Sequence, residues 1–176
     1  MAAITWYLVL FRIVHILAGV AWVGSVFLFV VFLQPTAAAI APAGAPFMAE
    51  LLGKRRLVDR IIALAMISVT GGLFLYWHDW HAYGTFGTWI GSTFGATLTV
   101  GMVAALVALA IGVRGTRPNV LRLLALGRQV AESAGPPSPE VGAEIGAIQA
   151  RLKILARVTL GLLVLSVLAM STARYL

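Results

Sequence analysis

The chain has 176 residues, of which 61% are hydrophobic and only 11% are charged. An ordinary soluble domain is about 45–50% apolar and about 25% charged, so this composition excludes that class, and it also excludes a disordered chain. The absence of cysteine excludes disulfides, thiolate-bound zinc and cysteine-held iron–sulfur clusters. The net charge of +7 is explained first by a membrane, because basic residues gather on cytoplasmic loops; nucleic-acid binding is not expected.

Four segments of the chain are apolar enough to cross a bilayer, which takes about 20 mostly apolar residues. They cover about residues 6–33, 61–77, 88–113 and 154–173. The first run has no basic region before it and is too long for a signal peptide, so we expect no signal peptide. The sequence therefore predicts one all-α transmembrane domain over residues 1–176, an integral membrane four-helix bundle. We expect Pro35 to end the first span.

The distribution of charge predicts the orientation of these spans. No Lys or Arg lies in the loop over residues 79–87, whereas eleven of the thirteen basic residues lie after the first or third span: Lys54, Arg55, Arg56, Arg60, Arg114, Arg117, Arg122, Arg128, Arg151, Lys153 and Arg157. The positive-inside rule places these segments in the cytoplasm of a bacterial-type inner (plasma) membrane, with both termini outside. Amphipathic rings prefer the interface, and eight map to the predicted outer boundary: Trp6, Tyr7, Tyr76, Trp77, Trp80, Tyr83, Trp89 and Tyr175.

The longest predicted cytoplasmic segment, about residues 114–153, favours a helical hairpin. Pro118 is typical of a helix start, and the chain breaks at residues 135–137. Ser138 then fits an N-cap with Pro139 at the first helical position, so a second helix can run on through the fourth span for roughly 35 residues. We favour a stiff connector that lies against the headgroups over an arm that docks a partner.

Glycines recur every four residues at Gly87, Gly91 and Gly95 in the third predicted span. Small residues let membrane helices approach closely. Tight packing is the simpler interpretation of this pattern, and a face that leaves room for a flat cofactor is the alternative.

One helical face of the first span carries Arg12, His15, Gly19 and Trp22. Ionisable residues inside hydrocarbon are expensive and by default indicate function. Neutral imidazole is a good ligand for haem iron or copper, an arginine can pair with a haem propionate, and a glycine permits a porphyrin to come close. The alternative is a histidine that is hydrogen-bonded to a neighbouring helix, with an arginine whose head reaches the outer headgroups.

Further candidate ligands are sparse. His78 and His81 flank Asp79 at the outer end of the second span, where they fit a second axial ligand, a copper-collecting patch, or simply residues that face water. Met170 and Met102 are soft ligands or ordinary packing residues. No acidic residue lies inside a predicted span, which argues against a carboxylate-based proton pump.

The stretch FRIVHILAGVAWVGSVFLF resembles the first helix of the superfamily that contains copper-resistance CopD domains, DUF2269-type membrane proteins and HemJ-type protoporphyrinogen oxidases. KRRLVDRIIALAMISVTGGLFLY is similar to their second helix, so the likeness covers roughly Phe11 to Tyr76. HemJ-type proteins have a basic residue three before a helix-one histidine and a tryptophan seven after it, as Arg12, His15 and Trp22 do here. They also carry a histidine and a lysine after a third-helix tryptophan, which the residues after Trp89 lack. The resemblance therefore implies haem binding by His15 rather than protoporphyrinogen oxidation.

Three functional hypotheses follow. The first is a haem b protein with a redox or electron-transfer role near the outer leaflet, in which His15 is an axial ligand, Arg12 with Arg174 meets a propionate, and His78, Met170 or a water takes the sixth position. The second is a CopD-like copper transporter or binding protein that uses His15, His78, His81 and Met170. The third is a non-catalytic membrane scaffold or assembly factor that acts through its hairpin. Candidate partners are membrane lipid, a quinone or redox protein, and a second copy of the chain.

Overall fold

The computed structural model describes residues 6–133 and 136–176, and every regular element within these ranges is helical. The α-helices are α1 (Trp6–Leu28), α2 (Gln34–Ala39), α3 (Gly44–Ala49), α4 (Leu57–Tyr83), α5 (Phe86–Gly91), α6 (Thr93–Ala110), α7 (Arg117–Glu132) and α8 (Pro139–Thr172). Three π-helical segments and one 3-10 turn join or extend them: η1 (Phe29–Leu33), η2 (Glu50–Lys54), η3 (Ile111–Thr116) and η4 (Ala173–Tyr175).

Four helical runs are long and apolar enough to cross a membrane, which confirms the all-α class and the number of spans. They cover Trp6–Ala39, Leu57–Tyr83, Thr93–Glu132 and Pro139–Tyr175. Large apolar side chains on their outer faces are exposed, as expected for surfaces that meet lipid tails. The fold is that of a multi-pass membrane protein.

The prediction that Pro35 ends the first span is wrong. Helix α1 passes through the π-helical segment η1 directly into α2, which continues to Ala39 with Pro35 in its first turn. A proline lacks the N–H that an α-helix uses and crowds the carbonyl four residues earlier. The wider π-helical turn just before Pro35 changes that hydrogen-bond pattern, so the helix continues past it.

The third predicted span is also not one continuous helix. Ser92 is extended, with φ −84° and ψ 142°, and its side chain caps α6 by accepting a hydrogen bond from the Gly95 N–H at 3.0 Å. Gly87 and Gly91 therefore belong to the short helix α5, and neither closely approaches another element. Only Gly95 makes a close approach, to the backbone carbonyl of Trp89. Trp89 is 0% exposed, so its ring packs inside the protein and does not face the surroundings.

The predicted start and length of the last helix are confirmed. Helix α8 runs for 34 residues from Pro139, and the Ser138 side chain accepts a hydrogen bond from the Val141 N–H. Its first part lies beside α7, where Arg122 donates two hydrogen bonds to Glu144, at 2.7 and 2.9 Å.

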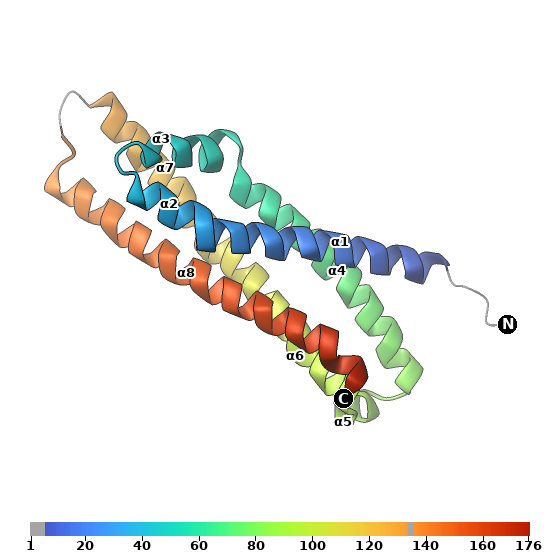
Figure 1. Ribbon diagram of the computed structural model, residues 1–176. Helices are drawn as coiled ribbons and strands as arrows, with labels where there is room; N and C mark the ends of the chain where they lie inside the picture. Colours follow the sequence, from blue (N-terminus) through green and yellow to red (C-terminus); the bar gives the residue numbers. More distant parts are fainter. Residues whose placement is uncertain (1–5, 134–135) are drawn as a thin grey trace.

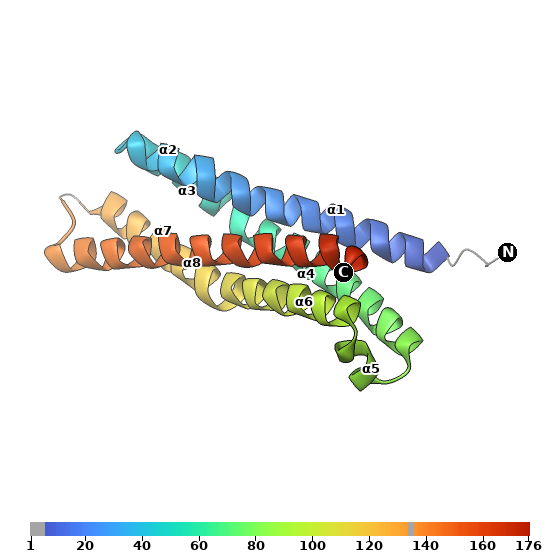
Figure 2. The same cartoon turned by 60° about the horizontal axis from the view of Figure 1, so that its bottom comes forward.

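The spanning helices form two close pairs, α1 with α4 and α6 with α8 (Figure 1). The α6–α8 pair runs side by side in both views (Figure 2). The start of α1 and the end of η4 lie at the same end of the bundle, and α7 lies at the other. The pairs meet at a buried core to which each spanning helix contributes: Trp22 and Val26 from α1, Ala65 from α4, Ala108 from α6 and Leu163 from α8.

Candidate cofactor site on the first helix

His15 lies against α4 and is held there by Ser68. The Nδ1 atom of His15 is 2.7 Å from the backbone carbonyl oxygen of Ser68. The Ser68 hydroxyl in turn donates a hydrogen bond of 3.0 Å to the backbone carbonyl of His15. A carbonyl oxygen only accepts, so Nδ1 carries a proton, and Nε2 is the nitrogen that could offer a lone pair.

The second ring nitrogen of His15, Nε2, has no hydrogen-bond partner among the described residues and could bind a ligand. It is also not among their fully buried polar atoms that lack a partner, so it keeps some accessible surface. An imidazole whose second nitrogen donates to a backbone carbonyl is the usual form of a metal-ligating histidine.

Three glycines make room for this arrangement. A methyl group at Gly72 would lie 2.7 Å from Cε1 and 2.9 Å from Nδ1 of His15. A methyl at Gly71 would lie 3.3 Å from Cβ of His15, and one at Gly19 would lie 3.0 Å from Oγ of Ser68. The space beside Gly19, where the sequence suggests room for a porphyrin, is thus taken by Ser68.

The two arginines of the hypothesis are exposed. Arg12 lies one turn from His15 on α1, and Arg174 lies in η4, which packs against α6 and α8. Within the described residues neither side chain makes a hydrogen bond or an ion pair. Both cations are therefore available to an anionic group, but they belong to different helix pairs.

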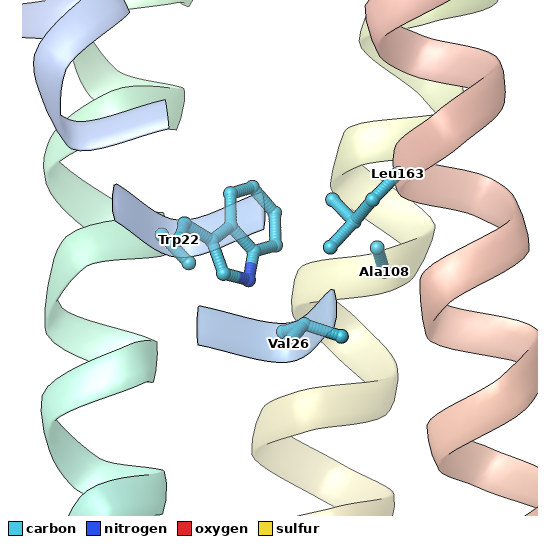
Figure 3. Packing of buried hydrophobic residues seen from close by; sticks show 5 residues of the cluster. Trp22, Val26, Ala108 and Leu163 are labelled. Atoms are coloured by element: carbon cyan, nitrogen blue, oxygen red, sulfur yellow. The ribbon is translucent and has the colours of Figure 1, made fainter. Parts of the chain in front are cut away.

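Trp22 points away from this site. Its indole is 4% exposed and extends from α1 toward Leu163 of α8 and Ala108 of α6 (Figure 3). It is a core residue that packs α1 against the α6–α8 pair.

The other candidate ligands are not gathered around His15. Helices α1 and α4 run antiparallel, so His78, six residues beyond Gly72, lies about 9 Å further along α4. Its Nδ1 is 3.5 Å from Asp79. His81 bonds the carbonyl of Trp77 at 2.8 Å. Met170 belongs to the α6–α8 pair, where it contacts Gly101.

No group of three or more His, Asp or Glu side chains that could hold a metal ion occurs in the described part of the chain. The structure does not bring the three histidines together, and His15 lies apart from His78 and His81. Ser68, which holds the ring, was not singled out in the sequence. Its signal is a polar residue three and four positions before Gly71 and Gly72, on the face that must meet α1.

Comparisons with protein-family models, with curated proteins and with solved structures find no match to this chain. The likeness to CopD and HemJ-type proteins therefore rests on the motifs of the first two helices alone.

Proposed function

We propose that this chain binds haem b through Nε2 of His15 and serves electron transfer or a small redox reaction near the outer leaflet. The observation that carries the proposal is the 2.7 Å contact between Nδ1 of His15 and the carbonyl of Ser68. It fixes the ring orientation and directs the lone pair to an atom with accessible surface, as iron ligation requires.

The chain's own residues would divide the work as follows. The Ser68 carbonyl accepts the Nδ1–H of the imidazole, which limits rotation of the ring, and the Ser68 hydroxyl donates to the His15 backbone carbonyl, which ties α4 to α1. Arg12 supplies a cation for a propionate, and Arg174 supplies a second one at the outer end of the bundle. Haem, when bound, supplies a one-electron iron couple. His78 and Met170 lie elsewhere and would not help to hold the group.

The test is an absorption spectrum of detergent-solubilised protein purified from haem-supplemented cells. We expect a Soret band and, after dithionite, an α band, both lost in His15→Ala. His81→Ala is the matched control, because His81 also bonds a carbonyl through Nδ1 but lies on the outer rim. A colourless wild type, or a His15→Ala protein with an unchanged spectrum, would overturn the proposal and leave the His15–Ser68 contact as a link between helices. Copper found instead by metal analysis would favour the copper-handling alternative.

The orientation proposed with this function is a bacterial-type plasma membrane with both termini outside and the basic segments, including the α7–α8 hairpin, in the cytoplasm. The support is the placement of basic residues. The chain has no cysteine, so each single-cysteine variant reports on one position. In intact cells we expect a membrane-impermeant maleimide to label Tyr175→Cys, and to label Gly127→Cys on α7 only after permeabilisation. The reverse pattern would contradict this orientation.

A further inference from the structure

The basic end of the bundle carries more cations than its carboxylates pair. Eleven basic residues lie there, and Glu50, Asp59 and Glu144 form ion pairs with five of them: Lys54, Arg55, Arg56, Arg117 and Arg122. The other six are exposed, and within the described residues their side chains make no hydrogen bond or ion pair: Arg60, Arg114, Arg128, Arg151, Lys153 and Arg157. These six cations therefore have no counterion in the described part of the protein.

Three of the six lie at one level of the bundle, each on a different spanning run. The buried core provides a reference layer, with one residue each from α4, α6 and α8: Ala65, Ala108 and Leu163. Toward the basic end, Arg60 lies five residues from this layer along α4. Arg114 lies six residues from it along α6 and η3, and Arg157 lies six residues from it along α8. At about 1.5 Å per residue, each arginine is roughly 7–9 Å from the layer.

This level is where the apolar band of the bundle ends. At the opposite end, the exposed rings of Trp77 and Tyr175 each lie twelve residues from the same layer, or about 18 Å. The two levels are thus about 26 Å apart, close to the roughly 30 Å of a hydrocarbon core. Lipid headgroups lie just beyond that core, within reach of a long arginine side chain.

The surroundings of these arginines favour a lipid over a free anion. Val113 and Val158 precede Arg114 and follow Arg157, and their side chains are 42% and 46% exposed. Acyl chains can cover these apolar side chains while the headgroup meets the cation. Asp59, next to Arg60, does not compete, because it already accepts hydrogen bonds from two other arginines.

We propose that Arg60, Arg114 and Arg157 bind the phosphodiester groups of anionic phospholipids at the basic edge of the bilayer. A guanidinium presents two parallel N–H donors to phosphate oxygens, and basic residues near a membrane surface attract anionic lipids. This surface is separate from His15 and does not depend on haem binding there.

The experiment is native mass spectrometry of the detergent-purified full-length protein, titrated with phosphatidylglycerol or with zwitterionic phosphatidylcholine. We expect wild type to bind phosphatidylglycerol several-fold more tightly. Arg114→Gln and Arg157→Gln should each weaken that binding about fivefold, and the double variant should lose the preference. Arg114→Lys with Arg157→Lys keeps both charges and should retain most of it.

Arg128→Gln with Arg151→Gln is the matched control. This pair removes two exposed, unpaired arginines of the α7–α8 hairpin, which lie further from the core layer, and should leave the preference unchanged. Equal binding of both lipids by wild type would overturn the proposal. An equal loss in the control pair would do so as well, because net charge alone would then explain the preference. Displacement of phosphatidylglycerol by an excess of sodium phosphate would point to a free-anion site instead and would also contradict it.

Discussion

The two helix pairs are held together by different means. Helices α1 and α4 close around a polar pair, His15 and Ser68, for which Gly71 and Gly72 leave the space. Helices α6 and α8 close around apolar groups, with Gly101 against Met170 and Ala169. Small residues thus permit close approach in both pairs. Only in the first does that approach also orient an imidazole ring, so the proposed haem site belongs to the α1–α4 pair.

The largest expected difference between the two helix pairs is in the stability lost when a methyl group is added at the glycine contact of each pair. Gly72→Ala places a carbon within 3.0 Å of the His15 ring and should cost about 1–3 kcal/mol. Gly101→Ala meets its neighbours at 3.1–3.3 Å and should cost less than about 1 kcal/mol. Unfolding in detergent measures both, and haem absorbance should fall only in Gly72→Ala.

Gly161→Ala provides the control for these two variants, because its methyl group would meet nothing within 4 Å. It should leave stability unchanged or raise it by up to about 1 kcal/mol through helix propensity. Equal losses in all three variants would mean that the glycine contacts do not distinguish the pairs.

A smaller difference is expected between the two buried serines. Ser68→Ala removes the 3.0 Å bond to the His15 carbonyl, and such bonds in membrane proteins contribute about 0.6 kcal/mol, with a maximum near 1.7. Ser166→Ala removes only a 3.9 Å contact with the Met170 sulfur. Denaturation in detergent should therefore rank Ser68→Ala as the less stable variant, with haem retained because the Ser68 carbonyl remains. The opposite order would contradict the polar nature of the α1–α4 contact.

The smallest effect on stability is expected at the start of α4. There Asp59 accepts hydrogen bonds from Arg117 of α7 at 2.7 Å and from Arg56 at 2.9 Å. Exposed ion pairs contribute about 0.2–1 kcal/mol and are screened by salt. Asp59→Asn should lower stability by this amount at low ionic strength and by less at high ionic strength. A loss independent of salt would show that Asp59 acts through packing instead.

Composition and capping predict most of this fold. The four apolar runs and the start of α8 at Ser138 and Pro139 follow from local sequence rules. The continuation past Pro35 and the break at Ser92 depend on a π-helical turn and on the burial of Trp89, which hydropathy does not encode. The sequence likewise predicts some residues of the candidate site and not others. Arg12 and His15 stand out as ionisable residues in an apolar run, whereas Ser68 matters only through its contact with another helix.

The most direct test of the central claim is chemical rescue of His15→Gly. If Nε2 of this residue is the iron ligand, the variant should lack the Soret band in buffer and regain it on addition of free imidazole, while His81→Gly keeps the band throughout. A His15→Gly protein that retains the wild-type spectrum without imidazole would contradict the claim, as would one that imidazole leaves colourless in the presence of haem.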